Sequence, residues 1–231
     1  MINSEIRAYS NSKDHPKTDA KFKAFLVNYN LEINKVNNKI YENEEFQKLA
    51  LNTPSEKINK ALSLTGIMVI LTEGSAYLEP NIRFLLESFK PYLSETMQSF
   101  LKLRIIDTEN PAAKDAAIVI PFNELAERIV SWEKFIIQNP EFVSIDEAKE
   151  IYNNYIYFYL TGLDNTSIYS YENKTLKEEV KQNYMEFIEK YPETKSGAIV
   201  KEYLKILERS NFKEGSKADK FLKENNYGRI E

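Results

Sequence analysis

Carboxylates are the only side chains in this sequence that occur in numbers suited to acid–base chemistry. Its 231 residues include 35 Asp and Glu, one His and no Cys. Without Cys the sequence offers no thiolate nucleophile, no Cys-bound zinc or iron–sulfur cluster and no disulfide. The one histidine, His15, lies beside Pro16 in a polar stretch, so we expect no nucleophile–histidine pair around it. The enzymatic chemistry left open is a pair of carboxylates, as a glycan-directed hydrolase uses.

The acidic segments do not match known metal or phosphate motifs. The stretch from Asp107 has Ala112 where a calcium-binding EF-hand loop needs glycine and Ile118 where it needs glutamate. The stretch from Asp164 fails at the same two positions, and no glycine-rich phosphate loop is present. Four other carboxylates fall on predicted helix surfaces, where charges usually face water: Glu133, Glu141, Glu147 and Glu150. The sequence therefore predicts no metal site, no cofactor site and no catalytic residue.

The segment from Gly162 to Tyr171 is the strongest candidate for contact with a partner. It links two predicted long helices and carries side chains that cap, hydrogen-bond and stack. Tyrosines are common in binding sites because each ring supplies contact area and a polar tip at low entropy cost. The predicted partner-binding residues are Tyr157, Asp164, Asn165, Tyr169 and Tyr171.

Two structural alternatives to this site remain open at this point. The segment after Gly162 could fold back and only cap its neighbouring helices, with Asp164 and Asn165 holding the end of the first one. The tyrosines of the preceding helix could be core, since helical spacing places Tyr152, Tyr155 and Tyr159 on one face and Tyr157 elsewhere.

The composition favours a folded helical chain. Apolar residues make up 42% and charged residues 29%, which excludes a disordered chain. Only 6 Gly and 8 Pro leave few turns, as long helices require. The net charge is -4 with both signs interspersed, which argues against a nucleic-acid partner because such proteins carry a basic excess or stripe.

Apolar residues spaced by three and four predict an all-α fold of about nine helices with no convincing strand. The first helix covers residues 19–41. The Thr53-Pro54-Ser55-Glu56 motif opens a second that runs to about Gly74, and Pro80 and Ser94 open two more. Residues 116–120 (AAIVI) are either a short buried strand or, since no partner strand is visible, a buried helix or extended linker.

The C-terminal half contains an internal repeat. Residues 132–155 align with 184–207 at a constant offset of 52 residues, which matches Phe135 with Phe187 and Ser144 with Ser196. Capping boxes at Ser144 and Thr175 each open a helix, so we expect helix pairs at 121–163 and 174–209 that stack on one another. Phe135 and Phe187 should be buried at equivalent places.

The run from Tyr184 to Ser196 resembles the inter-helix segment of tetratricopeptide-like proteins, and a looser version lies at residues 132–144. Across residues 184–207 it is similar to bacterial outer-membrane-assembly lipoproteins, in which an aromatic-x-x-Phe-Ile-x-x-Tyr-Pro segment precedes a polar turn and a second helix. The resemblance implies stacked helix pairs and a protein-binding role. The chain departs from the family in its period, 52 residues rather than about 34, and in lacking the usual Gly and Ala between paired helices.

The predicted organisation is a flexible lead over residues 1–18 and a single helical domain over 19–231. The most apolar stretch, Ala61–Leu71, is about half the length that spans a bilayer, so we expect no membrane-spanning segment. The polar lead fits a cytoplasmic tail or the tether left after a leader is removed. Guided by the resemblance, we expect a periplasmic or outer-membrane-tethered location, with the cytoplasm as the alternative.

The function predicted from the sequence is that of a non-enzymatic helical scaffold, which presents a helix-pair surface to a protein or other macromolecule of the bacterial cell envelope. The alternative is a helical enzyme with paired carboxylates that acts on glycans. An acidic pocket would favour the enzyme, and a broad groove lined with tyrosine would favour the scaffold.

Overall fold

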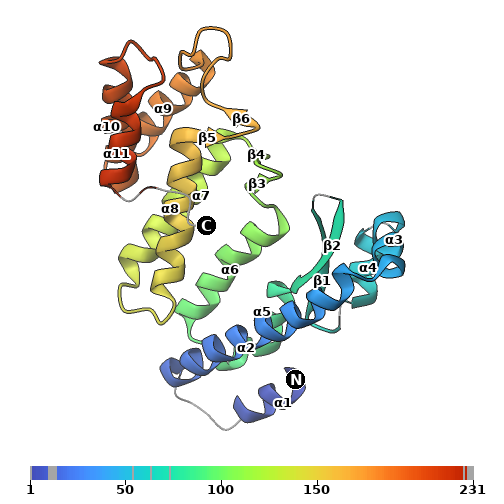
Figure 1. The fold of residues 1–231 in the computed structure, drawn as a ribbon. Coiled ribbons are helices and arrows are strands. Elements are labelled where there is room, and N and C mark those ends of the chain that lie inside the picture. Colours follow the sequence, from blue (N-terminus) through green and yellow to red (C-terminus); the bar gives the residue numbers. More distant parts are fainter. Residues whose placement is uncertain are drawn as a thin grey trace. The chain divides into compact units, whose positions relative to one another are not determined.

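The computed structural model describes residues 2–9, 15–53, 55–62, 64–72, 74–225 and 227. Over these residues it is mostly helical, with eleven α-helices and three two-stranded antiparallel sheets (Figure 1). The helical class is confirmed, while the prediction that no strand would form is wrong. By its internal contacts the chain divides into two compact units, Met1–Asn110 and Pro111–Glu231, where the sequence predicted one domain.

Unit 1 holds six helices, one short 3-10 turn and a β-hairpin. In chain order they are α1 (Ile2–Tyr9), α2 (His15–Tyr41), α3 (Glu44–Asn52), α4 (Ser55–Leu62), β1 (Ile67–Thr72), β2 (Ser75–Pro80), α5 (Ile82–Phe89), η1 (Lys90–Tyr92) and α6 (Glu95–Glu109). Ser94 caps α6 as predicted, since its hydroxyl accepts the Met97 N–H at 3.0 Å.

The predicted flexible lead is partly helical. Helix α1 occupies residues 2–9, and α2 already begins at His15. Tyr9 is buried, and its ring meets Phe89 edge-on with the ring centroids 5.5 Å apart. The burial of the Tyr9 ring among other aromatic rings stabilises the packing of α1 on the rest of unit 1. A wholly polar segment would not gain this free energy.

The helix predicted from the Thr53 motif to Gly74 stops at Leu62, and a β-hairpin follows it. Gly66 and Gly74 both have positive φ, +74° and +73°, a backbone conformation that ends a helix and favours a tight turn. The run from Ile67 to Thr72 is rich in β-branched residues, which suit a strand. The three-four spacing of its apolar residues is therefore misleading. The Thr53 motif itself lies partly outside the described residues.

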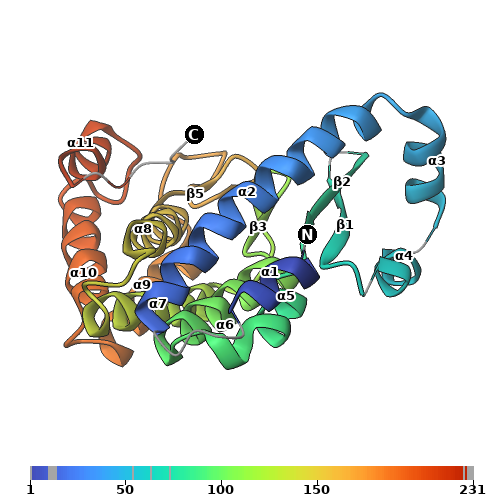
Figure 2. The ribbon, with the colours of Figure 1, turned by 90° about the horizontal axis from the view of Figure 1, so that it is seen from below.

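Side-chain amides cover the outer edges of this hairpin. Helices α2 and α3 contact β2, and α4 contacts β1 (Figure 2). From these helices Asn37, Gln47 and Asn59 each bond both the N–H and the C=O of one strand residue, at 2.6–3.2 Å. Asn37 binds Leu78, Gln47 binds Ala76, and Asn59 binds Val69. Each side-chain amide therefore takes the place of one residue of a neighbouring strand. At these positions the backbone groups on the open edges of the two-stranded sheet are hydrogen-bonded by side chains of the same unit.

Unit 2 holds two helix pairs, a final helix and two very short hairpins. In chain order they are β3 (Ala113–Lys114), β4 (Ala117–Ile118), α7 (Phe122–Gln138), α8 (Ile145–Thr161), β5 (Gly162–Leu163), β6 (Thr166–Ser167), α9 (Glu178–Lys190), α10 (Lys195–Glu208) and α11 (Ser216–Glu224). The segment 116–120 therefore contains a strand, whose partner β3 is too short to detect as a sequence pattern. In the described part of the chain no sheet exceeds two strands, as predicted.

The first helices of the two pairs end 52 residues apart, which is the offset of the sequence repeat. Helix α7 ends at Gln138 and α9 at Lys190, and the residues that follow share one backbone conformation: φ -134° and ψ 56° at Asn139, φ -128° and ψ 50° at Tyr191. The matched aromatic residues Phe135 and Phe187 are both buried, as predicted. Helix α7 packs along α8 and α9 along α10, while α9 and α10 also contact α7 (Figure 1).

The two predicted capping boxes of this unit do not form. Helix α8 begins at Ile145 as expected, but Ser144 makes no side-chain cap bond. Helix α9 begins at Glu178, three residues later than Thr175, because Thr175 and Leu176 instead form bridges with Lys213 and Tyr169. Because the backbone of Thr175 and Leu176 pairs with other loop residues, these two residues do not join the helix.

Replacing Phe135 or Phe187 with Ala should lower the free energy of unfolding by about 3–5 kcal/mol, because each ring is buried in a helix pair. Urea denaturation measures this, with Ile137→Ala as the control. Ile137 is 67% exposed on the same helix as Phe135 and should change stability by less than about 0.5 kcal/mol. A cost for only one of the two phenylalanines would contradict their equivalence.

Gln47→Ala should destabilise unit 1 by about 1–3 kcal/mol, because the N–H and C=O of the fully buried Ala76 lose their partners. The opened edge should also promote self-association, which size-exclusion chromatography at increasing concentration detects. Lys48→Ala, which removes only an exposed ion pair with Glu44 at 3.0 Å, is the matched control. Equal behaviour of the two variants would show that the amide does not protect the edge.

Candidate functional site

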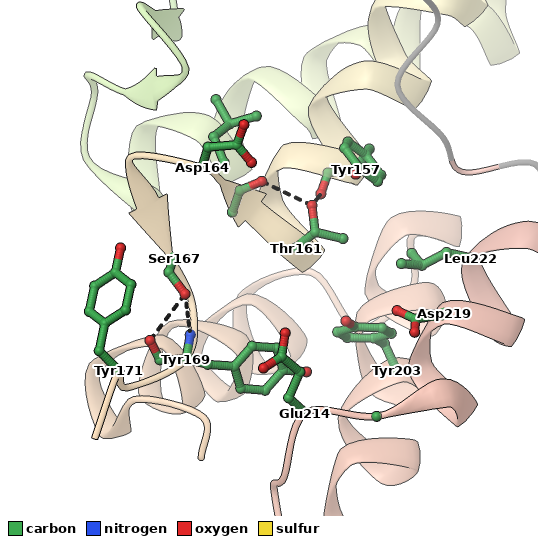
Figure 3. A pocket seen from close by; sticks show the side chains of 13 residues that line it. Tyr157, Thr161, Asp164, Ser167, Tyr169, Tyr171, Tyr203, Glu214, Asp219 and Leu222 are labelled. Atoms are coloured by element: carbon green, nitrogen blue, oxygen red, sulfur yellow. Dashed lines mark hydrogen bonds between the residues drawn. The ribbon is translucent and has the colours of Figure 1, made fainter. Parts of the chain in front are cut away.

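A pocket of about 370 Å³ lies in unit 2, between the end of α8, the β5–β6 hairpin and the residues around α11 (Figure 3). Its lining residues are Tyr157, Thr161, Gly162, Leu163, Asp164, Ser167, Tyr169, Tyr171, Tyr203, Glu214, Gly215, Asp219 and Leu222. The structure thus brings four of the five predicted partner-binding residues to one concave site, and only Asn165 lies outside it.

Gly162 makes the sharp bend that forms the upper wall of the pocket. Its φ is +69°, and a Cβ atom there would lie 2.2 Å from the Thr166 carbonyl oxygen, so no other residue fits this turn without a shift. The Thr161 hydroxyl donates to the carbonyl groups of Tyr157 at 2.8 Å and Gly162 at 2.9 Å, which fixes the last turn of α8. The chain therefore reverses directly after the helix and carries Asp164 and Ser167 to the pocket.

Tyr169 is positioned by hydrogen bonds of its own segment. Its N–H donates to the Ser167 hydroxyl at 3.1 Å, and the Ile168 carbonyl accepts the Lys177 N–H at 2.9 Å. The Tyr169 hydroxyl lies near that of Tyr203 on α10, whose ring is 2% exposed. Burial is the main cause that raises the pKa of both tyrosines, so both stay protonated at neutral pH.

The lining of the pocket carries negative charge without a matching cation. Its titratable lining residues besides tyrosine are Asp164, Glu214 and Asp219, and none of the thirteen lining residues is Lys, Arg or His. The charge of Asp219 raises the pKa of both Tyr169 and Tyr203, and that of Glu214 raises the pKa of Tyr169. These two carboxylates therefore lie close to the paired hydroxyl groups.

The lining residues missed in the sequence include three titratable ones: Tyr203, Glu214 and Asp219. Tyr203 sits at core spacing in α10, and the two carboxylates lie in an unremarkable polar stretch around the start of α11. They meet the Gly162–Tyr171 segment only because α10 and α11 fold back beside it, so no local pattern could have identified them.

Asn165 is not among the lining residues of the pocket and makes structural contacts. Its side-chain N–H donates to the Asp115 carbonyl at 2.7 Å, and its backbone N–H donates to the Ala116 carbonyl at 2.9 Å. The Ile118 N–H in turn donates to the Thr166 hydroxyl at 2.9 Å. Asn165 therefore ties the β5–β6 hairpin to the β3–β4 hairpin, and it does not hold the end of α8 as the alternative proposed.

The tyrosines of α8 divide as the helical spacing predicts. Tyr152, Tyr155 and Tyr159 are buried, which confirms the core alternative for this face. Tyr157 lies off that face, half-buried, and lines the pocket. Tyr171 is 70% exposed at the opposite side of the pocket, and the Lys174 ammonium lies 5.8 Å from its ring centroid.

Glu133 is buried, so its predicted place on a solvated helix surface is wrong. Its carboxylate accepts the backbone N–H groups of Lys195 at 2.7 Å and Ser196 at 2.8 Å, and the Ser196 hydroxyl as well. These are the first free N–H groups of α10, whose dipole favours a negative charge there. Tyr152 completes the cluster with a 2.9 Å bond to the Ser196 hydroxyl. Glu133 therefore caps the start of α10.

A second pocket, of about 390 Å³, lies between α7, α8 and the C-terminal residues Asn225 and Tyr227. Its lining adjoins residues outside the described part of the chain. Among the described residues no group of three or more His, Asp or Glu is placed to hold a metal ion. Within the same residues, every helix is too short or too polar to cross a bilayer.

In comparisons with protein-family models, curated proteins and solved structures, no match to this chain was found. The function is therefore inferred from the pocket and from the helix pairs that build it.

Glu133→Ala should lower the free energy of unfolding by about 2–4 kcal/mol, because it leaves buried N–H donors of α10 without an acceptor. Glu127→Ala is the matched control on the same helix. It removes a surface ion pair with Lys190 at 2.9 Å, worth less than about 0.5 kcal/mol. Thermal or urea denaturation compares the two, and equal losses would contradict the capping role.

Proposed function

We propose that this chain is a non-enzymatic helical binding protein, whose C-terminal unit presents tetratricopeptide-like helix pairs to a macromolecular partner. The observation that carries the proposal is the Tyr157 pocket, which four segments of unit 2 build together. Four of its thirteen lining residues are tyrosines, the residue type that dominates binding hot spots.

The repeat supports the stacked arrangement within this proposal. The two pairs share a buried aromatic residue at each inter-helix turn and the same backbone conformation after their first helices. A helix pair cannot bury its apolar face alone, so it packs on a neighbour and leaves an extended surface for partners. Helix α11 covers the end of the stack with Ala218, Phe221 and Leu222 buried.

The exposure of the aromatic rings supports a partner contact at the pocket. Tyr171 keeps most of its surface in water, and Tyr157 and Tyr169 are only partly covered. A large aromatic side chain gains free energy when it leaves water, so rings that surround a concave site are suited to receive a partner. At the base, Tyr203 is buried and Tyr169 half-buried, which restricts both rings and lowers the entropy lost on binding.

A second candidate function is a glycan-directed hydrolase, favoured by the three carboxylates Asp164, Glu214 and Asp219 in the same pocket. Such enzymes place two carboxyl groups on either side of the scissile bond. Incubation with a panel of oligosaccharides tests it. Release of reducing sugar that is lost in Glu214→Gln or Asp219→Asn would replace the binding proposal.

Replacing Tyr157 and Tyr171 together with Ala should weaken partner binding at least about tenfold, or 1.4 kcal/mol, since both rings border the pocket. The free energy of unfolding should change by less than about 1 kcal/mol because neither ring is buried. Tyr169 is left in place, since it is half-buried and its replacement would also affect the fold.

The measurement is affinity capture from cells of the native organism, followed by a titration with the purified partner. Tyr41→Ala is the matched control, because Tyr41 is an exposed tyrosine of unit 1. Binding that survives the double variant, or that Tyr41→Ala weakens equally, would overturn this site. Unfolding of the double variant would show that the rings belong to the core.

A further inference from the structure

The charge of the Tyr157 pocket restricts what it can receive. Asp164, Glu214 and Asp219 are lining residues, and none of the thirteen described lining residues is a cation. All three carboxylates are exposed, so they repel anionic ligands such as phosphates and acidic peptides through interactions that salt weakens. A cationic ligand would be attracted by all three carboxylates.

The carboxylates and the aromatic rings are close enough to act on one group. Tyr157, Tyr169, Tyr203, Glu214 and Asp219 all line the same pocket. Besides burial, the charge of Asp219 raises the pKa of Tyr169 and Tyr203, and that of Glu214 raises the pKa of Tyr169. In Figure 3 Glu214 and Asp219 lie on either side of the Tyr203 ring. A cation at this place would contact π-electron density and carboxylate oxygens together.

The outer rim of the site already holds a cation on an aromatic ring. Lys174 places its ammonium group 5.8 Å from the centroid of the Tyr171 ring. Lys174 is not among the described lining residues, so the carboxylates of the pocket can still bind a cation from a partner.

From these observations we propose that the pocket receives an arginine side chain of a protein partner, a refinement that rests on the proposed binding function. A guanidinium group is planar, stacks on aromatic faces and bonds carboxylates through a fork of N–H donors. The pocket matches each property with tyrosine rings and with Glu214 and Asp219. Its volume of about 370 Å³ is at the small end of ligand sites, which suits one extended side chain.

The test is an NMR titration of the full chain with the peptide acetyl-Gly-Gly-Arg-Gly-Gly-amide. The backbone amides of Gly162, Ser167 and Gly215 report on the pocket because all three residues line it. We expect saturable shifts at these amides that weaken as salt is added. The same peptide with citrulline, which keeps the shape of arginine but not its charge, should bind at least about tenfold more weakly.

The double variant Glu214→Gln, Asp219→Asn should also lose at least about tenfold in affinity for the arginine peptide. The control is Glu189→Gln, Glu193→Gln, which removes the same net charge at exposed positions outside the pocket and should leave the affinity within about twofold.

Equal binding of the arginine and citrulline peptides, or equal binding by the two double variants, would overturn the inference. A lysine peptide that binds as tightly as the arginine peptide would overturn the assignment of a guanidinium group. Shifts at the three amides with a neutral oligosaccharide but not with the arginine peptide would overturn it in favour of the glycan alternative. The binding function is judged separately. A partner whose capture needs Tyr157 and Tyr171 but not Glu214 and Asp219 would uphold the function and reject the arginine.

Discussion

The arrangement of unit 2 depends on one buried carboxylate. Glu133 projects from α7 and binds the first N–H groups of α10, so it fixes one helix of the second pair against the first pair. The free N–H groups at a buried helix end need an acceptor, and a carboxylate is the acceptor that the helix dipole favours. Helix α10 carries Tyr203 and leads to Asp219, so the position of the pocket wall follows from this bond.

In unit 1, too, buried backbone groups need hydrogen-bond partners, and here side-chain amides supply some of them. Its two-stranded sheet has no third strand on either side, and Asn37, Gln47 and Asn59 supply the missing bonds from three helices. Asp19 acts at the start of α6 as Glu133 does at the start of α10. Its carboxylate accepts both the backbone N–H and the hydroxyl of Ser94. Polar side chains at helix surfaces thus connect elements that apolar packing alone would leave free to slide.

The pocket combines rigid and open features, which is what a binding site requires. Tyr203 is buried and Tyr169 half-buried at the base, while Tyr171 and the carboxylates are exposed around it. A preformed base would lower the cost of binding a partner, and exposed charge would favour one partner over another. Tyr157, Asp164, Tyr169 and Tyr171, which the sequence singled out, line one pocket, because a turn after a long tyrosine-rich helix is a property of neighbouring residues.

The sequence by itself determined the mostly helical class, the helix pairs with buried Phe135 and Phe187, and four of the thirteen described pocket residues, since each depends on periodicity or on a local turn. Tertiary structure decided the rest. The apolar run after Gly66 fits a helix or a strand equally well, and became a hairpin because the amides of three distant helix positions cover its edges. Glu133 has the sequence context of a solvated charge and is buried only because α10 begins beside it. Glu214 and Asp219 reach the tyrosines only through the folding back of α10 and α11, a long-range contact that no local pattern encodes.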